Sequence, residues 1–233
     1  MHTPFHRLIV VSFLLGSLVL GGCDSPNKQQ TATPPNPAPP TTPDTTSTQF
    51  PGLPRLNGPA TVVMTIKGKQ ITIELDGKNA PISAGNFVDL VQQKFYNGLT
   101  FHRVVRKPQP FVVQGGDPKG NGSGGYVPAG ASGERRIPLE IKPLGAAVPV
   151  YSQEVSDRPE LQHKRGAIAM ARSAAFDSAS SQFYFTLADI SFLDGKYAVF
   201  GKITQGLEVI DTIEQGDKIT SAQVTKGIEN LKK

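Results

Sequence analysis

The sequence predicts a mainly β domain, in which a closed antiparallel barrel has two α-helices covering its ends. Short segments rich in β-branched and aromatic residues follow one another between residues 61 and 203, with glycine-rich loops between them. Only two stretches, near residues 81–95 and 207–214, carry apolar residues at the three- and four-residue spacing of a helix. Many short strands combined with few helices are typical of a closed barrel.

The N-terminal residues are expected to lie outside this domain. Residues 1–22 resemble a signal peptide, with a basic start that includes Arg7 and an apolar run from Leu8 to Leu20. That run is shorter than the roughly 20 apolar residues that a membrane span needs. Two glycines and Cys23 follow, in a pattern that resembles the lipobox of bacterial lipoproteins, whose cysteine is lipidated. We therefore expect a protein lipid-anchored to a bacterial membrane, on the exported side (periplasmic or extracellular face).

Residues 23–57 are expected to form the lipidated cysteine and a disordered tether. The stretch PPNPAPP at residues 34–40 favours an extended polyproline II conformation. The tether has too few apolar residues to bury enough surface for folding. The domain itself is expected over residues 58–228, followed by a C-terminal tail at 229–233. Because Cys23 is the only cysteine, the core must stabilise this domain without a disulfide.

Within the domain, the elements follow from local patterns taken in order. The β-rich runs 61–66 and 70–75 are separated by Lys67-Gly68-Lys69, which predicts a hairpin. A helix follows, with Pro81 at an opening position and Asn97-Gly98 after its end. Further strands are predicted at 99–105, 111–114, 167–171, 182–187 and 198–203, a second helix at 207–214, and a surface loop at 143–164.

Composition argues against several classes of function. The formal net charge is +5, but the charges are interspersed and form no basic stripe with interleaved aromatics, so no nucleic-acid partner is expected. Only His102 and His163 lie outside the signal peptide, and with Cys23 used as an anchor we expect no metal site and no cofactor. Residues 120–125 match G-x-G-x-x-G, but the strand and helix of a dinucleotide site do not flank them.

Two neighbouring predicted strands carry polar side chains beside apolar ones. The first segment reads FHRVV at residues 101–105, and the second reads FVVQGGD at residues 111–117. Strand alternation puts Phe101 and Arg103 on one face, and it puts Val112 and Gln114 together in the second strand. The two strands could thus present a guanidinium and an amide beside apolar groups. Spacing alone leaves open that Arg103 forms a surface ion pair and that Gln114 is merely solvated.

These two segments resemble the signature of the cyclophilins, in which Phe-His-Arg and two β-branched residues precede Phe-x-x-Gln-Gly-Gly-Asp. The segments PISAGNF at 81–87, SQFYF at 181–185 and FLDGKYAVFGK at 192–202 also resemble this family, in the family's order. The resemblance implies an eight-stranded antiparallel barrel capped by two helices, with a substrate groove on its outer face. It also implies peptidyl-prolyl cis-trans isomerase activity on proline-containing polypeptides, which the signal-peptide pattern would place among exported proteins.

The same resemblance implies a role for each site residue. Arg103 would be the catalytic arginine that stabilises the twisted imide nitrogen, and Gln114 would hold the substrate backbone beside it. The substrate-binding residues would be Phe111, Val112, Tyr184 and Leu193 in the proline pocket, Tyr197 at its rim, Ala171, Arg172 and Gln182 along the neighbouring groove, and His102 next to the site.

The chain departs from the family at the edge of the groove. Phe192 stands where many eukaryotic cyclophilins have a tryptophan that commonly donates a hydrogen bond to cyclosporin, so we expect weak cyclosporin binding. The loop at 106–110 is also longer than the family's usual link. We expect a monomer, and two other functions remain open. One is a non-catalytic proline-peptide-binding or scaffold module on the same fold, which the presence of Arg103, Phe111 and Gln114 together disfavours. The other is a hollow barrel for a small ligand, which bulky interior side chains disfavour.

Overall fold

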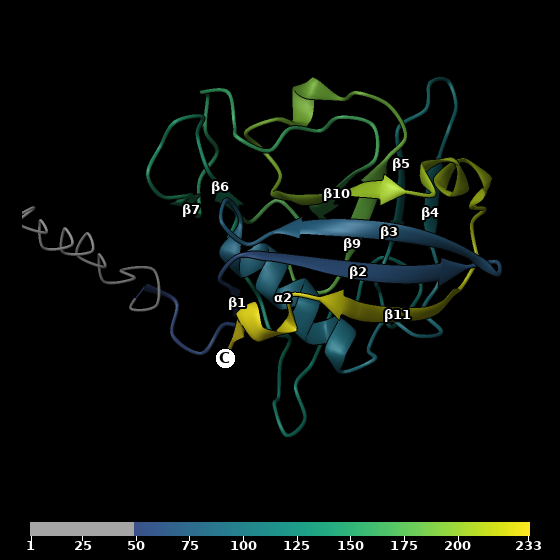
Figure 1. Cartoon of the computed structure of the whole chain (residues 1–233), viewed down its shortest axis with the longest axis horizontal. Coiled ribbons are helices and arrows are strands. Elements are labelled where there is room, and N and C mark those ends of the chain that lie inside the picture. Colours follow the sequence, from purple (N-terminus) through teal and green to yellow (C-terminus); the bar gives the residue numbers. More distant parts are fainter. Residues whose placement is uncertain (1–48) are drawn as a thin grey trace, which may run out of the picture. The chain divides into compact units, whose positions relative to one another are not determined.

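A computed structural model describes residues 49–233 (Figure 1). The predicted signal peptide, Cys23 and most of the predicted tether lie outside the described residues. Within residues 49–233, no helix is both long and apolar enough to cross a membrane. The elements in chain order are β1 (Arg55–Leu56), β2 (Pro59–Ile66), β3 (Lys69–Asp76), α2 (Pro81–Gln92), β4 (Arg103–Val105), β5 (Val112–Gly115), β6 (Glu140–Ile141), β7 (Val150–Tyr151), β8 (Ala167–Met170), β9 (Phe183–Thr186), the 3₁₀ helix η1 (Ser191–Leu193), β10 (Val199–Gln205), η2 (Leu207–Thr212), β11 (Ile219–Lys226), η3 (Ile228–Asn230) and β12 (Leu231–Lys232).

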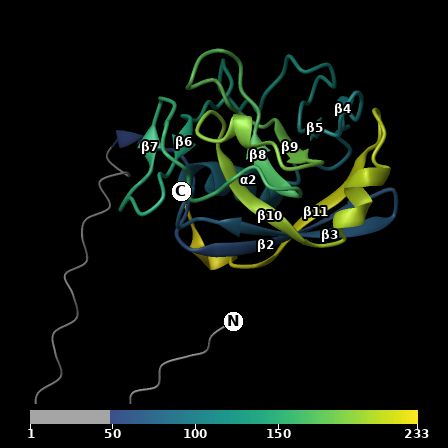
Figure 2. The same cartoon turned by 90° about the horizontal axis from the view of Figure 1, so that it is seen from above.

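The main sheet contains eight antiparallel strands in the order β11-β2-β3-β10-β8-β9-β5-β4. It is strongly curved, as Figures 1 and 2 show. The edge strands β11 and β4 do not pair with each other. The segments around their starts meet at an isolated bridge between Thr100 and Lys218, where backbone hydrogen bonds also join residues 98–101 to residues 216–219. The mainly β fold with helices is therefore confirmed, but the closed barrel is not: the described sheet curls and stays open between its edge strands.

The predicted hairpin is the long pair β2–β3. Lys67 and Gly68 both have positive φ, at 51° and 74°, which is the backbone geometry of a tight two-residue hairpin turn. Side chains at alternate positions of both strands are fully buried on the inner face: Val62, Met64 and Ile66 in β2, and Ile71, Ile73 and Leu75 in β3. Period-two alternation thus gives the sheet one apolar face that must be covered.

Helix α2 covers the inner face of the curled sheet. Its Phe87 packs edge-on against Phe183 of β9, with ring centroids 5.3 Å apart, and also contacts Phe200 of β10. The helix has no side-chain cap of its own. Instead, the buried carboxylate of Glu140 accepts hydrogen bonds from the backbone N–H groups of Ile82 and Ser83 at 3.0 and 2.7 Å. Burial raises the pKa of Glu140, although these two donors oppose the change.

The second predicted α-helix forms as the 3₁₀ helix η2. Only six residues separate Gly206, at φ 74°, from the extended backbone of Ile213, and short helical pieces of this kind commonly adopt the 3₁₀ form. Arg106, from the long loop at 106–110, donates to the carbonyl oxygens of Ile210 (3.1 Å) and Ile213. The loop therefore attaches β4 to the C-terminal end of η2.

Residues on both sides of the predicted domain limits take part in the folded structure. β1 and β12 pair antiparallel, with Leu56 opposite Leu231, and the side chain of Leu56 is fully buried. The folded part thus includes residues before 58 and after 228. β11 and the short pair β6–β7 are further strands that the sequence pattern did not predict.

Candidate functional site

Three of the predicted site residues lie in one row across neighbouring strands. The register pairs Arg103 of β4 with Gln114 of β5, and Gln114 with Tyr184 of β9. Residues directly opposite each other in antiparallel strands present their side chains on the same face. The flanking residues of β9, Phe183 and Phe185, point instead into the core around α2. Arg103, Gln114 and Tyr184 therefore share the outer face of the sheet.

A pocket of about 210 Å³ opens over this row. It is lined only by predicted site residues: Arg103, Phe111, Val112, Gln114, Ala171, Arg172, Tyr184, Leu193 and Tyr197. The aromatic and aliphatic side chains come from β5 and the residue before it, from β9, from the residue after β8 and from the turn around η1. Tyr197 packs edge-on against Tyr184, with ring centroids 6.3 Å apart. The result is a slot lined by aromatic and aliphatic side chains and bounded by two arginines, Arg103 and Arg172, of a size that suits a small ring.

A chain of side-chain hydrogen bonds fixes the polar edge of this pocket. Arg103 donates through Nη1 to Gln114 Oε1 at 3.3 Å, and its guanidinium lies 5.8 Å from the ring centroid of Phe111. Gln114 in turn donates to Gln182 Oε1 at 2.9 Å, and Gln182 donates to backbone carbonyls of the 122–124 loop. Among residues 49–233, Arg103 has no other hydrogen-bond acceptor, so its remaining N–H groups can donate to a ligand.

A second pocket of about 370 Å³ adjoins the first and shares Gln114, Ala171 and Arg172 with it. Gln182 lines only this second pocket, so the residues predicted for a neighbouring groove do lie along one. The Arg172 guanidinium lies 4.7 Å from the Tyr197 ring centroid and donates to the carbonyl of Lys196 at 2.8 Å. Arg172 is thus a fixed partition between the two pockets.

His102 lies outside both pockets. Burial lowers the pKa of His102, while nearby Asp117 and a hydrogen bond with Gln182 act to raise it. The Asp117 carboxylate accepts backbone N–H groups of the 119–122 loop, at 2.8 Å from Lys119. Burial alone would raise the pKa of Asp117, but these donors lower it. His102 and Asp117 therefore support the loop whose carbonyls hold Gln182.

The alternation predicted around Arg103 is wrong. Phe101 is fully buried in the core, whereas Arg103 is exposed at the pocket. The strand begins only at Arg103, and Phe101 donates its backbone N–H to Asp217 on the far side of the opening. An irregular segment before β4 thus lets the two side chains point to different faces.

Phe192 is an aromatic residue of the site that was not predicted as a binding residue. Its ring stacks on Phe111 with centroids 5.9 Å apart and an interplanar angle of 10°. The side chain is 63% exposed, which is unusual for phenylalanine. Its position next to Leu193 in the sequence was the available signal. Phe192 extends the apolar surface of the pocket outward.

Comparisons with known proteins place the chain beside one family. The family described as cyclophilin type peptidyl-prolyl cis-trans isomerase/CLD matches residues 61–232. A solved structure of a cyclophilin type peptidyl-prolyl cis-trans isomerase from Cryptosporidium parvum, in the presence of the dipeptide ala-pro, is 25% identical. It superposes with a TM-score of 0.56, over 71% of this chain and 99% of that one.

Several curated proteins are more similar in sequence. A Synechocystis protein named as a thylakoid lumen peptidyl-prolyl cis-trans isomerase is 42% identical over 198 residues, or 78% of this chain and 51% of that protein. The chloroplastic isomerase CYP38 of Arabidopsis thaliana is 35% identical over 206 residues, or 78% of this chain and 46% of that protein. The chain thus spans about half the length of these two relatives. A Helicobacter pylori peptidyl-prolyl cis-trans isomerase is 43% identical over 161 residues, or 68% of this chain and 83% of that protein.

Proposed function

Because the chain belongs to the cyclophilin type peptidyl-prolyl cis-trans isomerase family, we propose that it accelerates rotation about X-Pro bonds in polypeptides. The reaction is non-covalent and uses no cofactor. One observation carries the proposal: Arg103 and Gln114 lie side by side at the edge of an apolar pocket of about 210 Å³. That arrangement combines a slot for a proline ring with donors for the bond next to it.

The chemistry requires only that the enzyme favour a twisted bond. A peptide bond resists rotation by roughly 18–20 kcal/mol because its nitrogen lone pair is delocalised into the carbonyl. At the twisted stage the imide nitrogen becomes pyramidal and regains a lone pair that can accept a hydrogen bond. A guanidinium N–H of Arg103 at that nitrogen therefore binds the transition state better than either ground state. Each 1.36 kcal/mol gained in this way raises the rate about tenfold.

The other pocket residues hold the substrate while the bond turns. Phe111, Val112, Tyr184 and Leu193 enclose the proline ring, and Tyr197 bounds it at the rim. Gln114, itself held by Gln182, donates to the substrate backbone beside the proline. Ala171 and Arg172 would border the residues that precede it. The dipeptide ala-pro named with the Cryptosporidium structure supports a proline-containing ligand for this groove.

The alternative is a binding or scaffold module that uses the same groove without catalysis. A pure binding site would gain nothing from a guanidinium with free donors beside the imide nitrogen, because that nitrogen accepts no hydrogen bond while the bond is planar. Arg103 has only one side-chain acceptor among the described residues, and the strand register holds it beside Gln114. These features favour the isomerase.

We also propose that the protein acts on exported polypeptides, as a lipid-anchored monomer. The support comes from the signal-peptide pattern at 1–22, from Cys23 and from the PPNPAPP stretch of the tether. Two relatives carry names that place them in the thylakoid lumen and the chloroplast, which agrees with a protein outside the cytosol. Metabolic labelling with a radioactive fatty acid tests the anchor, since a Cys23→Ala variant should lose the label.

The isomerase proposal is tested by a protease-coupled assay on an Ala-Pro peptide, comparing the wild type with Arg103→Ala and Arg103→Lys. Loss of the donor should lower kcat/KM about 100-fold, the usual cost of removing one transition-state donor. Lysine should restore little, because a single mobile ammonium does not reproduce the planar guanidinium. Arg165→Ala is the matched control, since Arg165 pairs with Asp211 away from the pocket.

Circular dichroism must show that all variants are folded. An Arg103→Ala variant that keeps wild-type kcat/KM would refute the role of Arg103. A wild-type protein that isomerises the peptide no faster than the uncatalysed reaction, yet binds it, would establish the non-catalytic alternative.

A further inference from the structure

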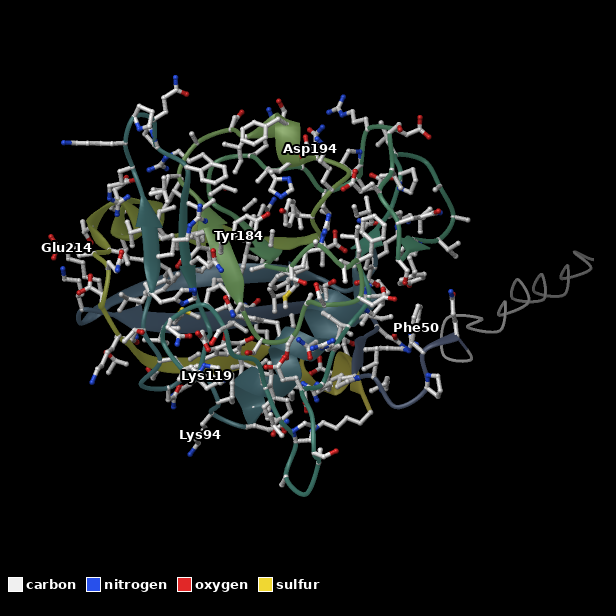
Figure 3. The ribbon with its side chains drawn as sticks, turned by 180° about the vertical axis from the view of Figure 1, so that it is seen from behind. Phe50, Lys94, Lys119, Tyr184, Asp194 and Glu214 are labelled. Carbon is white, nitrogen blue, oxygen red and sulfur yellow. The ribbon has the colours of Figure 1, made fainter. Side chains whose placement is uncertain are left out.

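Beneath the pocket, three polar side chains form a buried chain of hydrogen bonds. Asp194 Oδ1 lies 2.8 Å from His163 Nδ1, and His163 Nε2 lies 2.9 Å from the hydroxyl of Tyr184. The His163 residue is only 1% exposed, and its ring stacks nearly parallel to the Tyr184 ring. In Figure 3, Tyr184 lies near the middle of the view and Asp194 lies above it. None of the roles assigned above uses His163.

The chemistry of the three groups fixes the direction of this chain. A carboxylate can only accept, so the proton on the His163 ring sits on Nδ1 and is donated to Asp194. Nε2 is then an acceptor, and the Tyr184 hydroxyl donates to it. Burial lowers the pKa of His163, although Asp194 opposes this, and burial raises the pKa of Tyr184 far above its usual range. The neutral imidazole and the protonated phenol required here are therefore the stable forms.

His163 also holds the turn that carries the opposite wall of the pocket. Its backbone N–H donates to Asp194 Oδ1 at 2.8 Å, and its carbonyl accepts the N–H of Ile190 at 2.9 Å. These two contacts bracket η1, which carries Leu193 and Phe192. On its other side, the imidazole holds Tyr184 of β9. One residue thus connects two walls that are contributed by separate segments.

We propose that His163, with Asp194, is a positioning residue that sets the separation between Tyr184 and the η1 turn, and so the width of the proline pocket. The inference rests on the proposed function, because the pocket it shapes is the one assigned to the proline ring. The Tyr184 hydroxyl is hydrogen-bonded to His163 beneath the pocket. The pocket therefore presents the Tyr184 ring, and not an unpaired polar group, to its ligand. His163 contacts no substrate in this scheme and takes no proton from it.

The test compares the wild-type chain with Tyr184→Phe, His163→Ala, His163→Asn and the double variant Tyr184→Phe/His163→Asn. Tyr184→Phe removes only the hydroxyl, whereas His163→Asn removes the bond to Tyr184 but leaves a short side-chain donor for Asp194. Lys164→Ala is the neighbouring control, because that side chain points outward to Asp189. The measured quantities are kcat and KM for an Ala-Pro peptide, the peptide Kd from NMR titration, and the thermal midpoint of each variant.

A loosened pocket weakens ground state and transition state equally, so KM should rise while kcat stays nearly constant. We expect KM to rise about tenfold in His163→Ala and about threefold in Tyr184→Phe, with kcat within about twofold of the wild type. His163→Asn should add nothing in the Tyr184→Phe background, because the bond it removes is already absent. A residue with a merely structural role would lower the thermal midpoint and leave KM unchanged.

Folded His163→Asn and Tyr184→Phe variants with wild-type KM and Kd would overturn the proposal, as would fully additive effects in the double variant. These two variants decide the question even if His163→Ala does not fold. If the wild type binds the peptide but does not isomerise it, the proposed function fails. The Kd series then still decides whether His163 shapes the pocket.

Discussion

Asp89 has one buried and one exposed cationic partner. We predict that neutralising Asp89 lowers the free energy of unfolding more than removing its exposed partner does. Asp89 lies on α2 and is 2% exposed. One carboxylate oxygen accepts from Arg135 Nη1 at 2.6 Å and from Gln93 at 2.7 Å, and the other lies 2.6 Å from Lys233 Nζ. The two cationic partners differ in environment, because the Arg135 side chain is mostly buried whereas that of Lys233 is 62% exposed.

The magnitude follows from this difference in burial. Breaking a buried ion pair on one side costs about 3–5 kcal/mol, because the remaining charge stays buried without its partner. Asp89→Asn keeps a neutral acceptor of the same size, so we expect the free energy of unfolding to fall by about 2–4 kcal/mol. Lys233→Ala should cost less than about 1 kcal/mol, as an exposed pair does. At this domain size, 1 kcal/mol corresponds to about 2–4 °C in Tm.

The pH dependence gives the prediction a second, independent signature. Burial alone would raise the pKa of Asp89, but the hydrogen bonds and charges of Lys233 and Arg135 lower it below the ordinary value of 3.8. A carboxylate with a lowered pKa contributes stability above its unfolded-state pKa and loses that contribution as pH falls through the folded-state value. The difference in the free energy of unfolding between the wild type and Asp89→Asn should therefore shrink as pH falls below about 4.

Urea unfolding at pH 7, 5 and 3, followed by circular dichroism, measures these differences. If Asp89→Asn and Lys233→Ala lower the free energy of unfolding equally at pH 7, burial of the ion pair does not determine its contribution to stability. If the difference in unfolding free energy between the wild type and Asp89→Asn stays constant down to pH 3, the Asp89 carboxylate is not the titrating group.

Two further predictions concern the helix cap and the aromatic edge of the pocket. Glu140→Ala should lower the free energy of unfolding by about 2–5 kcal/mol, because two buried helix N–H groups lose their acceptor. The control is Glu74→Ala, on the exposed strand face. If both variants lose the same free energy of unfolding, Glu140 does not cap the helix. Cyclosporin should bind more weakly than nanomolar, because Phe192 lacks the indole donor that the family resemblance assigns to this position, and Phe192→Trp should tighten binding in isothermal calorimetry. A nanomolar Kd for the wild type would overturn that expectation.

The strands that the sequence predicted share a visible apolar pattern. β2 and β3 alternate cleanly between buried and less buried side chains, and β9 carries two phenylalanines that reach the core. β11 was missed because Ile219–Lys226 is mostly polar and buries only Ile219 and Ala222. Its place in the sheet depends on pairing with β2, which no local pattern reveals. The β1–β12 pair depends in the same way on residues that are far apart in the chain.

The pocket residues could be named from the family resemblance, but the reason why they meet could not. The register that aligns Arg103, Gln114 and Tyr184 is a property of three paired strands, and the sequence of a single strand does not reveal it. His163 shows the limit most clearly. Its partners Tyr184 and Asp194 lie 21 and 31 residues further along the chain, with no periodic signal between them. A single histidine in a predicted surface loop therefore gave no indication of its burial.

The pairing of β1 with β12 has a mechanical consequence. β1 and β12 form a two-stranded sheet, a clasp that is separate from the main sheet, and the residues just before β1 also pack on the domain, since Phe50 lies against Tyr151 with ring centroids 5.1 Å apart. Figure 1 shows the C-terminus beside β1, so both ends of the clasp lie together. Phe50 and the fully buried Leu56 therefore hold the N-terminal end of the described chain outside the sheet that contains β4, β5 and β9. A pull applied at residue 49 would thus act first on contacts that the strands lining the pocket do not make.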